Sequence, residues 1–202
     1  MPTIVLASQS PSRRAILERA GITPEVVVSN VDEPAVTATA GALGSRAVAE
    51  LLARTKAEEV GARCRTASDR FVLGCDSVLD IDGVPYGKPH TPEAARRQWD
   101  LMRGREAVLY SGHWLIGGSG AVGAVSATTV RIADVSDDEI DAYIATGEPL
   151  EVAGALTIDG LGGPYVTGID GDHHGVLGLS LPLLRQLFLD LGVTWHTLWN
   201  RG

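Results

Sequence analysis

The chain has 202 residues, 45% hydrophobic and 21% charged, and a formal net charge of −8 at pH 7. A chain of this length and composition can bury a sizeable core. Its acidic balance argues against a general nucleic-acid binder, which usually carries a basic face. No apolar run reaches the roughly 18 residues of a membrane-spanning helix, and the start lacks the pattern of a signal peptide. We therefore expect a cytoplasmic protein with no nucleic-acid or membrane partner.

Strand and helix signals alternate along the chain. Local signals mark several ends: Pro11 in a first turn, the turn pair Asp82-Gly83, and the capping box of Ser136 with Glu139. In chain order the expected elements are a strand at 3–7, a helix at 11–20, a strand at 25–29, a helix at 43–60, a strand at 71–79, a helix at 91–103, a hairpin of strands at 107–116 and 121–132, a helix at 136–145, a Gly-rich region of loops and short strands at 147–179, and a helix at 181–191. This order predicts an α/β protein with a mixed sheet, because the hairpin adds antiparallel strands.

The segment Ser8-Gln9-Ser10-Pro11-Ser12-Arg13-Arg14 is a candidate phosphate site. A strand ends here and a helix begins, and the N-terminal end of a helix offers free N–H groups and partial positive charge to an anion. Arg13 and Arg14 in the first turn would oppose the helix dipole. Their presence makes better sense with a bound phosphate, although two surface arginines on an amphipathic helix are the alternative.

Asp76 interrupts an otherwise apolar strand. A buried, ionised carboxylate needs a cation, a metal or several hydrogen-bond donors. Asp76 is therefore a candidate metal ligand or general base, and a structural aspartate that accepts backbone hydrogen bonds is the alternative. Strand alternation puts Asp76 on the face of Gly74 and Val78, and we expect Gly74 to leave room there for a ligand.

Only two of the 17 Lys and Arg residues are lysines, Lys56 and Lys88. Lys56 flanks the buried stripe of its predicted helix and can extend from the core towards a cleft. Lys88 lies in Gly87-Lys88-Pro89, a rigid turn that can aim an ammonium group at a phosphate. Glu33 follows a predicted strand, and carboxylates in such loops suit hard cations such as Mg²⁺. Each of these residues taken singly is more often a solvated surface group.

Together these segments resemble the Maf family, and the resemblance covers nearly the whole chain. One block alone is weak evidence, but the ordered set is highly specific. The matching segments are Leu6-Ala7-Ser8-Gln9-Ser10-Pro11 with Arg13 and Ile16-Leu17, Asp32-Glu33, Lys56-Ala57, Gly74-Cys75-Asp76-Ser77-Val78, Gly87-Lys88-Pro89, Tyr143, Gly147-Glu148-Pro149, Ala153-Gly154, Ile158-Asp159-Gly160 and Val176-Leu177-Gly178-Leu179.

The resemblance implies one domain over residues 1–202, with a long mixed sheet and two α/β lobes around a deep cleft, similar to inosine-triphosphate pyrophosphatases. It implies hydrolysis of nucleoside triphosphates to the monophosphate and diphosphate with a divalent metal, Mg²⁺ or Mn²⁺. Family members are thought to clear noncanonical nucleotides, are linked to arrest of cell division, and are often dimeric.

The resemblance also assigns roles. Asp76 would be the general base that activates water, and Glu33 with Asp76 would hold the metal. The triphosphate would be bound by the hydroxyl and cationic side chains of the first segment and by the two lysines, namely Ser8, Ser10, Arg13, Arg14, Lys56 and Lys88. Metal and cations would neutralise the transferring phosphoryl group while the carboxylate orients the water.

Some positions depart from the family pattern. Ser12 stands where many members have a first arginine, and Val152 stands where a lysine commonly precedes Ala-Gly. Ser77 replaces the usual threonine, and Asp159 replaces the glutamine common in the branch that prefers dTTP and UTP. An ionised aspartate cannot donate a hydrogen bond. Ser77 and Asp159 are therefore candidate specificity residues and leave the preferred base open, including 7-methyl-guanine.

Two other functions compete with this one. A nucleotide-sensing regulator of septum formation would bind nucleotide with little catalysis, and Val152 allows that interpretation. The combined presence of Glu33, Lys56, Asp76 and Lys88 argues against it. An enzyme for deaminated purines is the third possibility, and the segment that begins at Ser8 argues against it.

Overall fold

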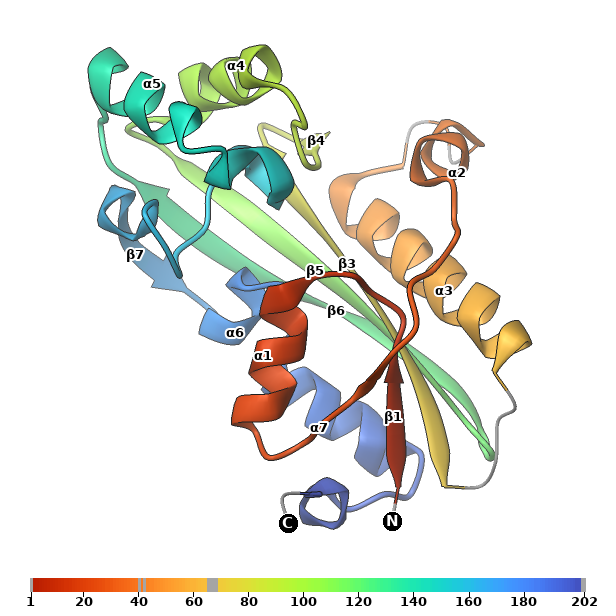
Figure 1. The fold of residues 1–202 in the computed structure, drawn as a ribbon. Helices are drawn as coiled ribbons and strands as arrows, with labels where there is room; N and C mark the ends of the chain where they lie inside the picture. The colour runs from red at the N-terminus through yellow and green to blue at the C-terminus, as the bar shows by residue number, and fades with distance from the viewer. Residues whose placement is uncertain (1, 40, 42, 65–68, 201–202) are drawn as a thin grey trace.

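The computed structural model describes residues 2–39, 41, 43–64 and 69–200. These residues form a mixed seven-stranded sheet with helices on both faces (Figure 1), which confirms the predicted α/β class. The strands are β1 (Thr3–Leu6), β2 (Glu25–Val26), β3 (Arg70–Ile81), β4 (Val84–Tyr86), β5 (Glu106–Gly117), β6 (Gly120–Ile132) and β7 (Val166–Asp170).

The sheet order is β2-β1-β3-β5-β6-β7, and β4 pairs with β3. β1 runs parallel to β2 and β3, whereas the other pairs are antiparallel. The long hairpin is confirmed, since Gly117 pairs with Gly120 across a two-residue turn. At Asp82 and Gly83 φ is 55° and 82°, the left-handed geometry that a tight hairpin turn requires at both central residues.

The helices follow the predicted order with two additions, at 33–39 and 173–176. They are α1 (Pro11–Arg19), α2 (Glu33–Thr39), α3 (Ser45–Arg63), α4 (Pro92–Met102), α5 (Asp137–Ala145), α6 (His173–Val176) and α7 (Leu181–Asp190), with short 3₁₀ turns at Glu148–Glu151, Ala153–Ala155, Gly163–Tyr165 and Trp195–Leu198. The capping box of Ser136 and Glu139 at α5 is present as predicted. In the described part of the chain, every helix is too short or too polar to cross a membrane.

Two predictions about local structure are wrong. The strand expected at 25–29 forms only at Glu25–Val26, because β2 is an edge strand that pairs with β1 through two residues. Glu33, expected in a loop, is the first residue of α2. A carboxylate in the first turn of a helix interacts favourably with the helix dipole, and Asp32 additionally accepts the Ala35 N–H at 3.0 Å.

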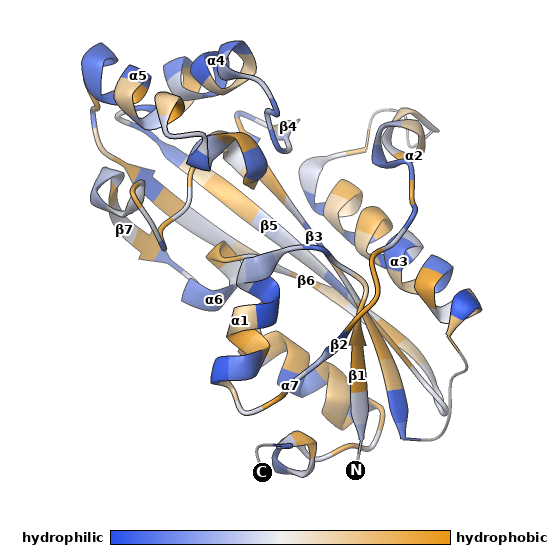
Figure 2. Cartoon of the chain, viewed as in Figure 1, coloured by the Kyte–Doolittle hydropathy of each residue, from blue (hydrophilic) through white to orange (hydrophobic). Residues whose placement is uncertain are grey.

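Buried side chains lie on both faces of the sheet. On one face α1 and α7 cover a core that includes Leu17, Leu73 and Phe188, and on the other face α3 covers two smaller clusters. A further core around Trp99 and Tyr143 lies where α4 and α5 pack at one end of the sheet. The helices alternate between hydrophobic and hydrophilic residues, as elements with one buried face should (Figure 2).

The glycine expected to make room for a ligand instead makes room for a helix. A Cβ on Gly74 would overlap the carbonyl oxygen of Ala53 and lie 2.8 Å from the Cβ of Ala57, both in α3. Gly112, on the neighbouring strand, meets the Ala49 carbonyl of the same helix in the same way. Glycine at both positions therefore lets the α3 backbone approach the sheet closely. This close approach brings α3 side chains within reach of the residues beside Gly74 in β3.

Two separate strands, β1 and β4, pair with one edge of β3 and leave a break between them. β1 pairs with residues 70–73 of β3 and β4 pairs with residues 79–81, whereas β5 lines the opposite edge over residues 72–80. Among the described strands, residues 74–78 of β3 thus have a partner on one side alone. The chain leaving β1 begins α1 at this break, so polar side chains gather there.

Candidate active site

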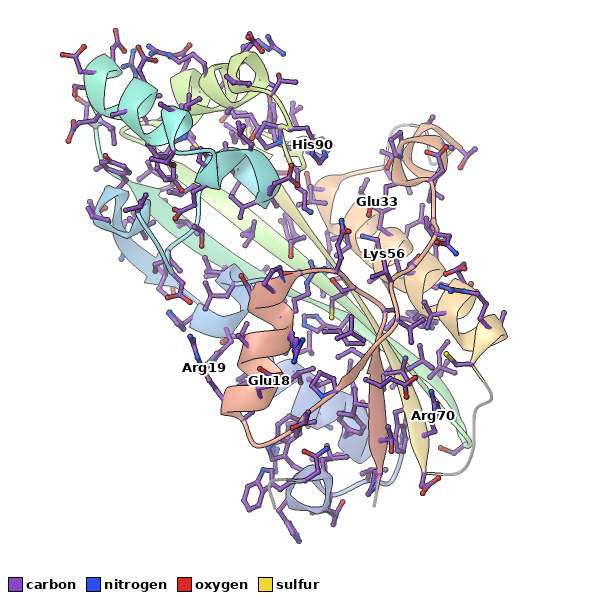
Figure 3. The ribbon with its side chains drawn as sticks, viewed as in Figure 1. Glu18, Arg19, Glu33, Lys56, Arg70 and His90 are labelled. Carbon is purple, nitrogen blue, oxygen red and sulfur yellow. The ribbon has the colours of Figure 1, made fainter. Side chains whose placement is uncertain are left out.

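Asp76, Lys56 and Glu33 form a chain of charges at the break in the sheet. Asp76 lies in the middle of β3 and faces α3, where Lys56 Nζ is 2.5 Å from Asp76 Oδ1. The same ammonium lies 2.7 Å from Glu33 Oε1, and Figure 3 shows Lys56 and Glu33 side by side between α2 and α3. Lys56 and Asp76 are 8% and 7% exposed, whereas the Glu33 side chain is 50% exposed. These three charged groups therefore extend from the protein interior to solvent.

The pKa of Asp76 is raised above its ordinary value. Burial is the largest cause, because it disfavours the ionised form, and the nearby charge of Glu33 acts in the same direction. The positive charges of Lys56 and Arg13 oppose the shift. A carboxylate with a raised pKa is a stronger base than one in water, and perturbed pKa values gather at functional sites.

The two carboxylates provide part of the ligand set that a divalent cation needs. Within the described ranges, no three His, Cys, Asp or Glu side chains come together to hold a metal ion. Mg²⁺ usually takes only one or two protein carboxylates and fills its other positions with water and substrate phosphates. Glu33 and Asp76, both bonded to the Lys56 ammonium, supply such a pair.

The segment after β1 surrounds the start of α1. Ser10 is the N-cap of the helix, and its Oγ accepts the Arg13 N–H at 3.4 Å. Ser8 Oγ accepts the Ser10 N–H at 3.2 Å and an Arg13 Nη1 hydrogen at 3.1 Å. A hydroxyl that accepts two bonds still has its own proton to donate, so Ser8 can offer that proton to an anion.

Arg13 is buried and holds three parts of the chain together. Its Nε donates to the Gly178 carbonyl at 2.9 Å, and its Nη1 donates to the Cys75 carbonyl at 2.9 Å as well as to Ser8. Its Nη2 donates to Ser77 Oγ at 3.1 Å. These bonds engage four of the five N–H groups of a guanidinium, and the fifth, on Nη2, can donate to a ligand. Arg13 is therefore a structural clamp with one donor in reserve.

Two other predicted site residues lie apart from this cluster. Arg14 is exposed and pairs with Glu18 one turn along α1, at 2.7 Å. Asp159 lies 3.7 Å from Arg19, at the opposite end of α1 from Ser10. Both residues are exposed and paired with other charges.

Lys88 follows β4 on the other side of the break. Its Nζ lies 3.8 Å from a carboxylate oxygen of Glu151, and its side chain is 36% exposed. The loop that carries it is held at Gly87, whose carbonyl accepts the Gly154 N–H at 3.2 Å and Gln98 Nε2 at 3.3 Å. Lys88 is thus an exposed cation on a fixed loop.

Sequence reasoning missed two buried polar residues of β5, Ser111 and His113. Ser111 Oγ lies 2.9 Å from Ser77 Oγ. His113 Nε2 accepts the Ser180 N–H at 2.9 Å, and His113 Nδ1 lies 3.0 Å from the Ser111 carbonyl. The available signal was the spacing of Ser111 and His113 by two residues in an apolar strand, which places both on one face.

Comparison with known proteins identifies the class of this molecule. The sequence profile of the Maf-like proteins matches residues 3–191, so the chain belongs to the Maf-like family. Relatives named nucleoside triphosphate pyrophosphatase include those of Leifsonia xyli subsp. xyli, 53% identical over 98% of this chain and 97% of that one, and Salinispora tropica, 52% identical over 98% and 88%. The relative of the same name from Streptomyces coelicolor is 50% identical over 97% of this chain and 94% of its own.

Among solved structures, the Ham1 protein of Staphylococcus aureus superposes with a TM-score of 0.43 and 17% identity. That match covers 65% of this chain and 72% of Ham1.

Proposed function

We propose that this protein is a nucleoside triphosphate pyrophosphatase that releases a nucleoside monophosphate and diphosphate, with Asp76 as the group that accepts the proton of the attacking water. The observation that carries the proposal is the buried Asp76, its pKa raised, in contact with a buried lysine in a Maf-like chain. Full-length relatives at about half identity that bear the enzyme's name support the same activity.

The cationic groups around the break suit a triphosphate. Ser8 has a hydroxyl proton to donate, the N-terminal end of α1 carries partial positive charge, and Arg13 keeps one Nη2 hydrogen. Lys56 and Lys88 add positive charge on the two sides of the break. These groups would bind and orient the phosphates so that Asp76 faces the water that attacks.

Glu33 and Asp76 would hold a divalent cation, Mg²⁺ or Mn²⁺. When bound, such an ion neutralises negative charge on the phosphates and helps orient the nucleophile. Lys56 now bonds both carboxylates. Once a cation binds those carboxylates, the Lys56 ammonium would be available to bind the phosphates.

The test is a panel of canonical and modified nucleoside triphosphates with Mg²⁺ or Mn²⁺, assayed separately for diphosphate and orthophosphate. Asp76→Asn keeps the size of the side chain but removes its basicity. We expect it to abolish diphosphate release while nucleotide binding, measured by calorimetry, is largely kept. Asp170→Asn, at an exposed position in β7, is the matched control and should retain activity.

Each outcome has a definite meaning. Diphosphate from the native protein and from Asp170→Asn, but not from Asp76→Asn, would establish the reaction and the base, and the ranking of nucleotides would identify the preferred substrate. Nucleotide binding without turnover in the native protein would reject the enzyme and favour the nucleotide-sensing regulator.

A further inference from the structure

The side chains next to Arg13 form a chain of hydrogen bonds, called the relay below. The groups at its two ends determine which atom donates and which accepts at each step. Arg13 Nη2 lies 3.1 Å from Ser77 Oγ, which lies 2.9 Å from Ser111 Oγ. Ser111 Oγ in turn lies 2.8 Å from the carbonyl oxygen of Gly175. A guanidinium can only donate and a carbonyl can only accept, so both ends of the relay have a fixed polarity.

The bond between the two serines then has one possible direction. The single hydroxyl proton of Ser111 is committed to the Gly175 carbonyl, so Ser77 must donate its proton to Ser111. Ser77 also accepts from Arg13. A ligand atom that reaches Ser77 therefore meets a lone pair and not a proton.

This polarity limits what Ser77 can recognise. Phosphate oxygens are acceptors and would be repelled by the Ser77 lone pair, whereas an N–H or O–H group of a base or sugar would be accepted. The polarity of Ser77 is imposed by Ser111 from the interior, because Ser111 is fully buried and Ser77 is half-buried.

The segment between α6 and α7 is built against the relay. Gly178 has φ of 96°, and a Cβ there would lie 3.2 Å from both Arg13 Nε and Ser77 Oγ. The Gly178 carbonyl also accepts from Arg13 Nε. The relay and this turn therefore hold one another, and a change in Ser111 should reach Arg13 through Ser77.

We propose that Ser111 is a positioning residue of the proposed pyrophosphatase. It fixes Ser77 as a hydrogen-bond acceptor towards the nucleotide and, through Ser77, keeps Arg13 in place. The inference rests on the proposed function. It can be tested separately through the binding of a polyphosphate, at a site that Ser111 itself does not touch.

A pair of neighbouring serines provides the test. Ser126 pairs with Ser111 across β5 and β6, and its hydroxyl donates to the Ser111 carbonyl at 3.4 Å, outside the relay. Ser111→Ala should raise KM for a nucleoside triphosphate about tenfold, the usual size of a lost hydrogen bond near a charged group. It should also weaken binding of inorganic tripolyphosphate in calorimetry, in this case solely because Arg13 is held less firmly, since phosphate oxygens do not bond Ser77. Ser126→Ala should leave both values within about twofold.

Two further variants separate positioning from general loss of structure. Ser111→Thr keeps the hydroxyl and should restore most of the affinity. The double variant of Ser77→Ala and Ser111→Ala should bind tripolyphosphate about as weakly as either single variant, because both break the same relay. If Ser111→Ala does not fold, Ser111→Cys, which keeps the size of the side chain but donates and accepts weakly, carries the same comparison with Ser126→Cys.

Equal losses in Ser111→Ala and Ser126→Ala, effects of Ser77→Ala and Ser111→Ala that multiply, or a native protein that does not bind tripolyphosphate would each overturn the inference. A native protein that binds tripolyphosphate but releases no diphosphate from any nucleotide would reject the proposed function alone. The calorimetric comparison would still decide the role of Ser111.

Discussion

Acidification should destabilise this protein through one buried histidine. The His113 side chain is fully buried, and its Nε2 accepts the Ser180 N–H. The ring is therefore neutral, with its proton on Nδ1, which donates to the Ser111 carbonyl. Burial, aided by the positive charge of Arg13, lowers the pKa of His113 from 6.5 to about 4.

The sign and size of the effect follow from this pKa. In the unfolded chain the same ring takes up a proton near its ordinary pKa of 6.5. The unfolded state thus binds more protons than the native state between pH 6.5 and about 4, so the free energy of unfolding falls as the pH falls through that range. At about 1.4 kcal/mol per pKa unit, the loss is about 3 kcal/mol in total and about 2 kcal/mol between pH 7 and pH 5.

The assay is urea unfolding at a series of pH values from 7 to 5. His113→Gln removes the titrating ring while its amide oxygen can still accept the Ser180 N–H, and His196→Gln, at an exposed position, is the control. The carboxylates titrate alike in all three proteins, so the difference between curves isolates His113. The native protein and His196→Gln should lose about 2 kcal/mol more than His113→Gln between pH 7 and pH 5. Parallel curves for the native protein and His113→Gln would refute the reasoning.

Three more predictions concern packing and buried charge. Gly74→Ala should lower the free energy of unfolding by about 3 kcal/mol in urea, because its methyl group would overlap α3; Gly61→Ala, whose methyl group would meet Ile116 at an ordinary 3.4 Å, should not be destabilising, and similar losses in both would contradict this. Lys56→Met should cost about 3 kcal/mol at pH 7 by leaving the Asp76 carboxylate buried without its cation. Because the pKa of Asp76 is already raised by burial, its protonation should make that deficit smaller at pH 5, and a deficit that stays constant would argue against a buried charge. Tyr143→Phe should cost about 2 kcal/mol in the same assay, because the hydroxyl donates to Glu148 at 2.9 Å; an unchanged stability would show that water replaces the bond.

Short-range features were determined by the sequence alone. The helix start with Pro11 in its first turn, the capping box of Ser136 and Glu139, and the Asp82-Gly83 turn form as predicted, because each depends on atoms within three or four residues of one another. The mixed sheet followed from the order of elements and the long hairpin. The importance of Asp76 also followed, because a carboxylate in an apolar strand must have a partner wherever the strand lies.

Other features required the tertiary structure. Sequence alternation put Gly74 on the Asp76 face, but it could not show that α3, rather than a ligand, fills the space there. The shortness of β2 depends on its place at the sheet edge, which no local pattern encodes. Arg14 and Asp159 were candidate site residues, yet they lie on exposed surfaces with partners of their own.

The candidate site likewise has features that the sequence predicted and features that required the tertiary structure. The residue types at Ser8, Arg13, Lys56 and Asp76 indicated phosphate chemistry from the sequence alone. The way they are used depended on contacts across the chain: Arg13 meets Gly178, 165 residues away, and Ser111 directs the hydroxyl of a serine 34 residues before it. A sequence specifies which groups can donate or accept, but only the packing of distant segments decides which of those groups are already engaged and which remain for a ligand.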